Sequence, residues 1–185
     1  MIWLLLPVVL IVGWLIYLYN ALIRLANRAD NAWADIDVQL KRRYDLVPNL
    51  VEVVKGYAAH ERTTFEKVAA ARAAAMDAYS PAEKNVVEPN LIAGVRSLFA
   101  LAEAYPALKA NEEFLNLQRN LAEIEDQVQA ARRYYNAVVR DLSIKLQSFP
   151  NALVAPLFGV KPREYFQLDS PAEAQAVNVK FGAGA

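Results

Sequence analysis

The sequence WADIDVQLKRRYDLVPNLVEVVKGYAAHE, from Trp33 to Glu61, decides how this chain folds. It carries a helical pattern and then meets Pro48, whose nitrogen has no hydrogen to donate to the Tyr44 carbonyl. Proline also disfavours a helical conformation at the residue before it, Val47. We therefore expect a first helix to kink or end between Tyr44 and Val47. A second helix should return from about Asn49 to Ala78.

The N-terminal segment from Met1 to Ile23 contains no charged side chain. As a helix it would reach about 34 Å, enough to cross a hydrocarbon core about 30 Å thick. A cleaved signal peptide is the alternative, but the apolar run is too long, no Lys or Arg precedes it and no A-x-A site closes it. We predict a transmembrane helix, with aromatic residues toward the two interfaces: Trp3, Trp14, Tyr17 and Tyr19.

The first positive charges, Arg24 and Arg28, lie on the C-terminal flank of this segment. The positive-inside rule places the domain that follows in the cytoplasm. The membrane should be crossed once, by this segment. A periplasmic or extracellular domain is the alternative.

Apolar residues continue beyond the membrane segment in alternating steps of three and four, which is one face of a helix. No helix breaker separates the two parts, so we expect one continuous helix from about Trp3 to Arg43, on the order of 60 Å long. The apolar face consists of Leu22, Ala26, Ala29, Trp33, Ile36 and Leu40.

After the second helix, the segment from Tyr79 to Asn90 has two prolines and no apolar period, which predicts a loop. A shorter helix should span about Leu91 to Tyr105 and stop at Pro106. Asn111 is the expected cap of the next helix.

That next helix has the most regular apolar period in the chain and should run for about 55 Å until Pro150. Its repeating positions are Phe114, Leu117, Leu121, Ile124, Val128, Ala131, Tyr135, Val138, Leu142, Lys145 and Phe149. Together these patterns predict an all-α protein. Its N-terminal transmembrane helix continues into an antiparallel helical bundle with long, coiled-coil-like helices.

Three prolines and a glycine among large apolar residues follow Phe149, which predicts a non-regular segment capping one end of the bundle. From Gln167 the chain is small and polar, so most of it should be mobile, with a hint of a short strand over residues 177–181. We therefore expect three parts: a transmembrane helix over 1–23, a bundle over 24–168 and a flexible tail over 169–185.

Composition excludes several classes of function. Lys+Arg and Asp+Glu balance at 20 each, so no basic surface is available for nucleic acid. Cysteine is absent, and the single histidine, His60, has Tyr57 where a Glu-x-x-His metal motif needs glutamate. No nucleophile elbow or phosphate-binding glycine loop occurs. We therefore expect no catalytic residue, no cofactor and no metal site, and a surface or capping role for His60.

Three polar groupings remain. The cluster Lys41, Arg42 and Arg43 has nearby aspartates that offset it, which favours a solvated face over a phosphate site. A polar groove is the alternative to ordinary solvent exposure for Asn116, Arg119, Asn120, Glu123, Arg132, Arg133, Asn136 and Arg140. Core positions are favoured over a partner surface for Tyr44, Tyr134 and Tyr135.

Four stretches resemble, in order, the LemA family of bacterial membrane proteins. They are AWADIDVQLKRRYDLVPNLVEVVKGYAAHE (32–61), NLQRNLAEIED (116–126), ARRYYN (131–136) and FPNALVAPLFGVKPREYF (149–166). The resemblance covers nearly the whole chain. It implies an N-terminal membrane helix and an antiparallel helical bundle, and no established enzyme activity. A distant relative, the magnetosome protein MamQ, implies a part in membrane organisation.

These observations lead to one functional hypothesis and one alternative. The hypothesis is a membrane-anchored scaffold or interaction protein, involved in membrane or envelope organisation, whose bundle presents a surface to copies of itself or to other proteins. Self-assembly would use close contacts between membrane helices at Gly13, shared by Ala26, Ala29 and Ala32. The alternative is an enzyme, or a subunit of one, that uses a polar groove between bundle helices. A water-accessible cavity between the helices would strengthen the case for this enzyme alternative.

Overall fold

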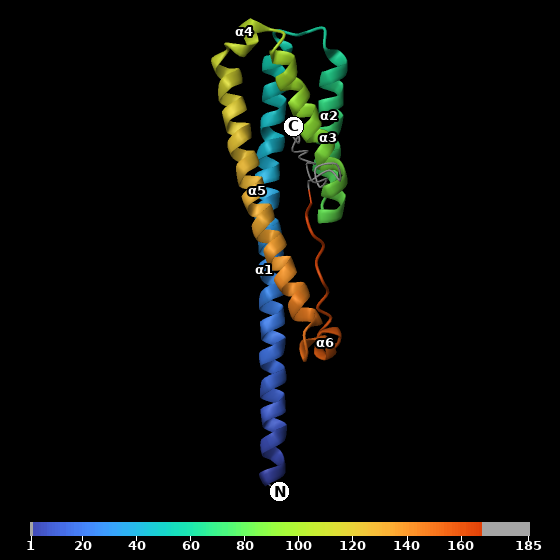
Figure 1. Cartoon of the computed structure of the whole chain (residues 1–185). Helices are drawn as coiled ribbons and strands as arrows, with labels where there is room; N and C mark the ends of the chain where they lie inside the picture. Colours follow the sequence, from blue (N-terminus) through green and yellow to red (C-terminus); the bar gives the residue numbers. More distant parts are fainter. Residues whose placement is uncertain (1, 168–185) are drawn as a thin grey trace, which may run out of the picture.

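The computed structural model describes residues 2–167, with side chains from Leu5 onward. All its regular elements are helices, so the predicted all-α bundle is confirmed. In chain order they are α1 (Ile2–Lys55), α2 (Arg62–Asp77), α3 (Pro81–Ala102), α4 (Pro106–Lys109), α5 (Glu112–Gln147), α6 (Asn151–Val154) and the 3-10 helix η1 (Ala155–Phe158). α1 and α5 lie side by side and antiparallel, α2 and α3 form a second antiparallel pair, and the N-terminal part of α1 extends alone (Figure 1).

α1 is one helix of 54 residues. Its N-terminal part is the one region of the described chain long and apolar enough to cross a membrane. Large apolar side chains are exposed there from Leu5 to Tyr17, whereas from Leu18 onward the apolar face is buried against the bundle. The predicted continuity of the first helix past the apolar segment is therefore correct.

The predicted kink or end near Tyr44 to Val47 is wrong, because α1 continues through Pro48 to Lys55. Pro48 leaves the Tyr44 carbonyl without its usual amide donor. Arg72, on α2, fills that vacancy by donating from Nε to the Tyr44 carbonyl oxygen at 2.7 Å. A donor from another helix thus satisfies the carbonyl and offsets part of the cost of the proline.

The chain turns instead at residues 56–61, so the predicted helix 49–78 is divided between the end of α1 and α2. Gly56 stands at this break, and glycine costs a helix about 1 kcal/mol relative to alanine. Within this connection, Ala58 is buried in the core. His60 is exposed in this connection.

The predicted loop from Tyr79 to Asn90 is also wrong, since α3 begins at Pro81 and runs through Pro89. Ser80 accepts a hydrogen bond from the Glu83 amide, and the Glu83 carboxylate accepts one from the Ser80 amide, which is a capping box. Pro81 is at the first helical position, where its missing N–H has no cost. Hydrogen bonds from the Ser80 and Tyr79 amides hold the pKa of Glu83 below its ordinary value.

α5 follows its prediction closely. Asn111 caps it by accepting a hydrogen bond from the Phe114 amide at 2.9 Å. The helix ends at Gln147, two residues before the predicted limit. Most of the predicted repeat is buried against α1 and the rest of the core: Phe114, Leu117, Leu121, Val128, Tyr135, Val138 and Leu142.

The segment after α5 contains α6 and η1, two short helices where a non-regular cap was predicted. Residues 160–167 then run back along the bundle (Figure 1). Phe166 is fully buried there, with its ring 5.4 Å from that of Trp33. The predicted strand at 177–181 and the predicted tail at 169–185 lie outside the described residues.

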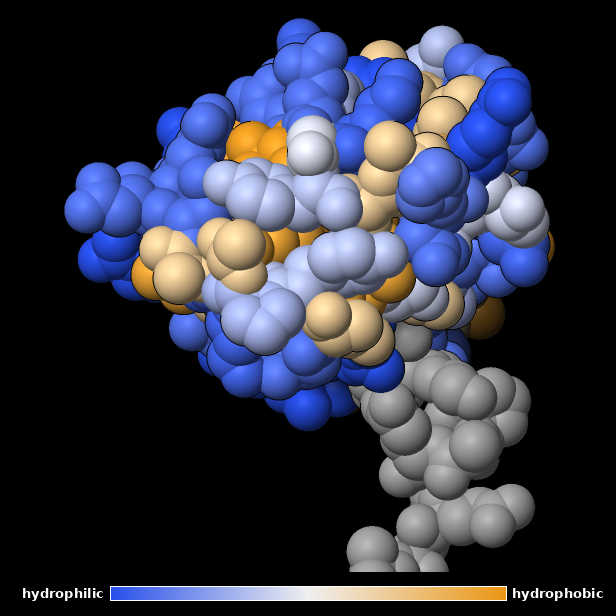
Figure 2. All heavy atoms as spheres, turned by 90° about the horizontal axis from the view of Figure 1, so that it is seen from above, coloured by the Kyte–Doolittle hydropathy of each residue, from blue (hydrophilic) through white to orange (hydrophobic). Residues whose placement is uncertain are grey.

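The end of the bundle remote from the N-terminus is mostly hydrophilic, with scattered apolar residues among the polar ones (Figure 2). α4 and the connection from α1 to α2 lie at this end (Figure 1).

Candidate functional site: a groove over a buried ionic cluster

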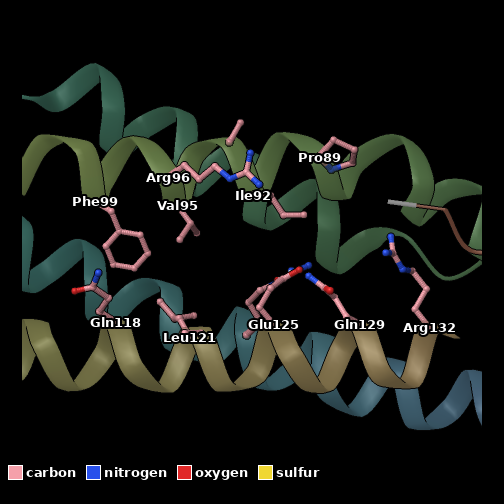
Figure 3. A pocket seen from close by; sticks show the side chains of 13 residues that line it. Pro89, Ile92, Val95, Arg96, Phe99, Gln118, Leu121, Glu125, Gln129 and Arg132 are labelled. Atoms are coloured by element: carbon pink, nitrogen blue, oxygen red, sulfur yellow. The ribbon is translucent and has the colours of Figure 1, made fainter. Parts of the chain in front are cut away.

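A groove of about 510 Å³ lies between α3 and α5 (Figure 3). Ile92, Val95 and Phe99 project from α3 toward Leu121 on α5, which makes much of the lining apolar. The ring of Phe99 also packs edge-on against that of Phe114, at a centroid distance of 5.8 Å. Concave, largely apolar sites of this volume are typical of ligand-binding surfaces.

Polar side chains border the apolar lining. α3 contributes Arg96, and α5 contributes Gln118, Glu125, Gln129 and Arg132. The carboxylate of Glu125 accepts a hydrogen bond from Arg43 Nη1 at 2.7 Å. Arg96 and Arg132 are the other charged side chains that line the groove.

Arg43 belongs to α1 and connects the groove to a buried ionic cluster beneath it. Its Nη2 donates to Glu88 of α3, and the Tyr44 hydroxyl donates to the other oxygen of the same carboxylate. Glu88 is fully buried and Arg43 nearly so. A buried charge is stable only when it is paired and hydrogen-bonded, and Glu88 meets both conditions.

Lys84, one turn before Glu88 on α3, completes the cluster. Its buried ammonium donates to the Tyr44 hydroxyl and to the Ala75 carbonyl, both at 3.2 Å, and lies 3.6 Å from Asp37. It also lies 5.0 Å from the centre of the Tyr44 ring, within the range of a cation–π contact. The cluster therefore joins α1, α2, α3 and α5 at one level of the bundle.

Tyr44 keeps its proton in this environment. Burial raises the pKa of its phenol far above the usual value, and the charge of Glu88 and its hydrogen bond add to that increase. The phenol thus remains a donor to Glu88 throughout the physiological pH range, which suits a structural role and not a base or a nucleophile.

The structure agrees only in part with the predictions for the basic cluster at 41–43 and for the three tyrosines. Lys41 and Arg42 are exposed as expected, whereas Arg43 is buried, contrary to the predicted solvated face. Tyr44 and Tyr135 occupy core positions, and Tyr134 is exposed. Glu88 and Lys84 escaped prediction because they fall in the segment expected to be a loop.

The eight residues of the predicted polar groove on α5 do not lie in one groove. Asn116, Arg119, Asn120 and Glu123 are exposed. Only Arg132 of the eight residues lines the α3–α5 groove. Arg132 also lines a second hollow, of about 350 Å³, together with Arg133, Asn136 and Arg140.

Asn136 and Tyr135 hold the returning C-terminal segment in place. The Asn136 amide group donates to the Phe166 carbonyl at 2.9 Å and accepts from the Phe166 amide at 3.0 Å. The Tyr135 hydroxyl donates to the Glu164 carbonyl at 2.7 Å, and burial raises the pKa of this phenol to about 12. These polar residues of α5 thus support the fold.

Neither the groove nor the cluster contains the parts of a known catalytic site. The described residues that line the groove include no serine, cysteine or histidine, and its carboxylate is paired with Arg43. Within residues 2–167, the His, Asp and Glu side chains form no group of three that could hold a metal ion. The mostly apolar lining, bordered by polar side chains, is suited to binding an apolar ligand or segment.

Comparison with known proteins identifies relatives of this architecture. The chain is 24% identical to magnetosome protein MamQ 2 of Paramagnetospirillum magneticum over 88% of its own length and 69% of the relative's. It is 22% identical to magnetosome protein MamQ of Magnetospirillum gryphiswaldense, covering 80% of this chain and 64% of that one. It is 27% identical to protein LemA of Metamycoplasma hominis, covering 74% and 63%.

The family model described as LemA family matches residues 32–181. The match begins at the start of the motif that runs through Pro48 and includes α2, α3, α5 and the returning segment. It therefore covers the groove and every member of the ionic cluster. The chain belongs to the LemA family.

Proposed function

We propose that this protein is a single-pass membrane scaffold of the bacterial inner membrane, with its bundle on the cytoplasmic side. The observation that carries the proposal is the continuity of α1, which has its apolar side chains exposed up to Tyr17 and buried in the bundle beyond. Exposed apolar residues over this length suit a lipid environment. The magnetosome proteins among its relatives support a part in membrane organisation.

The scaffold assembles with copies of itself through the exposed part of α1. Gly13 has open space where a side chain would project, so another helix can approach closely there. The sequence also suggested Ala26, Ala29 and Ala32, but these alanines are buried within the bundle and have no surface to offer. The contact is therefore confined to the apolar segment.

The α3–α5 groove receives an apolar helical segment with acidic residues from a partner protein. Its apolar lining and the exposed cationic side chain of Arg96 are complementary to such a segment. An enzyme acting in this groove is the second candidate, favoured by the cavity itself. The scaffold is preferred because the groove is mostly apolar and the carboxylate that lines it, that of Glu125, is paired with Arg43.

A flexible linker tests the role of α1. A Gly/Ser insertion after Tyr17, where the exposed part of α1 ends, should leave both parts folded but uncouple the bundles from the membrane segment. Crosslinks between bundles of neighbouring copies should then change pattern, while protein extracted from membranes remains the same size. An unchanged crosslink pattern would contradict the rigid-stem scaffold.

A second experiment tests the groove. Ala122 lines it and is exposed, so Ala122→Trp should fill it at little cost to folding. Ala130 is exposed on the same helix outside the groove, which makes Ala130→Trp the matched control. Crosslinking in intact cells should show partner adducts that disappear with Ala122→Trp and persist with Ala130→Trp. Equal adducts in both variants would show that the groove is not the partner site.

A further inference from the structure

The segment from Phe149 to Phe158, which contains the short helices α6 and η1, forms a cap. It lies beside the exposed part of α1, at the lower end of α5 (Figure 1). The ring of Phe158 packs edge-on against Tyr19, with centroids 4.9 Å apart. Nearby, Trp14 and Leu18 share a hollow of about 460 Å³ with Phe149. The cap is thus level with residues 14–19 of α1.

This level is inside the apolar segment and not beyond it. The charge-free run of α1 continues to Ile23, which is about 6 Å along the helix axis from Tyr19 and about 13 Å from Trp14. On the side away from the cap, Ile16 and Tyr17 are exposed. A membrane that covers the whole apolar segment would therefore also reach the cap.

The surface of the cap is apolar where it faces solvent. The exposed fractions are 70% for Leu153, 81% for Leu157 and 81% for Phe149, values unusual for large apolar side chains in water. Leu153 and Leu157 are four residues apart, about one helical turn. The opposite end of the bundle, by contrast, is mostly hydrophilic (Figure 2).

Positive charge borders this surface. Lys145 lines the same hollow as Trp14 and Phe149, together with Asp141, which is paired with Arg140, and Lys161 is exposed shortly after η1. Lysines next to apolar and aromatic residues at a bilayer surface extend their ammonium groups toward lipid phosphates. The combination matches segments that lie in the interfacial layer of a membrane.

We propose that the cap is a second membrane contact, with Phe149, Leu153 and Leu157 inserted among lipid headgroups and upper acyl chains. This inference rests on the proposed function, in which α1 crosses the bilayer. With α1, the cap fixes the bundle at two points and so sets its height and tilt relative to the membrane.

Absence of cysteine makes a direct test available. Single cysteines are introduced as Leu153→Cys and Leu157→Cys in the full-length protein, labelled with an environment-sensitive fluorophore and reconstituted into phosphatidylcholine–phosphatidylglycerol vesicles. Quenching is measured with nitroxide groups on the lipids. Val86→Cys on α3 is the matched control, because its exposed fraction of 72% is close to that of Leu153. Val8→Cys reports on α1 itself.

Labels at positions 153 and 157 should be quenched by the lipid nitroxides nearly as strongly as the label at position 8, and the label at position 86 should not be quenched. Quenching at position 8 alone overturns the cap proposal and leaves the membrane anchor intact. No quenching at position 8 contradicts the anchor itself. If positions 153 and 157 are shielded from water and show transfer between labels on different copies, but no lipid quenching, a second protein copy covers the cap and the proposal is wrong.

Discussion

The two parts of α1 place the same kinds of residue in opposite surroundings. From Leu5 to Tyr17 most apolar side chains point outward and are exposed, whereas between Leu22 and Leu50 most of them face the bundle core and are buried, with Val38 as an exposed exception. The second part also carries Arg43, whose charge is buried in an ion pair with Glu88. One helix therefore has an exposed apolar part and a part that packs in the bundle core. The position of a residue along α1 decides how much a substitution lowers the free energy of unfolding.

The largest contrast should come from an unpaired charge placed in each part. Leu142 on α5 is fully buried in the core beside α1. Leu142→Asp should lower the free energy of unfolding by about 3–5 kcal/mol, because the carboxylate has no partner there. Leu121→Asp should act in the same direction.

Val8→Asp is the matched change in the exposed part of α1. It should leave thermal melting of the detergent-solubilised protein unchanged and reduce membrane insertion instead. Circular dichroism in detergent measures the first effect, and extraction with alkaline carbonate measures the second. Equal melting of Leu142→Asp and the parent would show that the core face of α5 is misassigned.

The ionic cluster gives the next contrast. Glu88→Ala leaves Arg43 and the Tyr44 hydroxyl buried without the carboxylate that they share, and should cost about 3 kcal/mol. Glu103→Ala breaks the exposed pair with Lys109 and should cost less than about 1 kcal/mol. Urea unfolding compares the two. A similar small loss for both variants would mean that the buried cluster contributes no more than a surface pair.

A smaller effect should follow from removing the donor that compensates for Pro48. Arg72→Ala should cost about 1 kcal/mol, since the Tyr44 carbonyl loses its hydrogen bond. In a Pro48→Ala background the backbone amide of residue 48 can bond to that carbonyl, so the same change should cost less. A double-mutant cycle measures this coupling. Strict additivity of the two changes would contradict the compensating role of Arg72.

The smallest effect should appear only at high pH. The pKa of Tyr135 is raised from 10.0 to about 12, so above pH 10 the unfolded chain releases this proton while the folded chain retains it. The folded state then binds more protons than the unfolded state, and stability must fall as pH rises from 10 to 12. Tyr135→Phe should lose less stability over this range than the parent. Denaturant midpoints at pH 8, 10 and 11.5 would check it, and parallel decreases in the two proteins would contradict it.

Local sequence signals determined most of the helical framework. The period of apolar residues predicted α5 and its buried face, and Asn111 predicted its start, because both depend on residues three or four positions apart. The charge-free run predicted the exposed part of α1. The Ser80-Pro81-x-Glu83 pattern is typical of a helix start and agrees with the start of α3. The two prolines of the same segment favour a loop, so local sequence signals conflict there.

Only the tertiary structure decided where α1 ends and where the site lies. Pro48 is tolerated because Arg72, from another helix, donates to the carbonyl that the proline leaves free. Arg43 is buried, unlike its neighbours Lys41 and Arg42, because Glu88 and Glu125 reach it from two other helices. Helix signals act over a few residues and are visible in sequence. Pairing of buried groups depends on partners tens of residues away, and only packing of the helices brings them together.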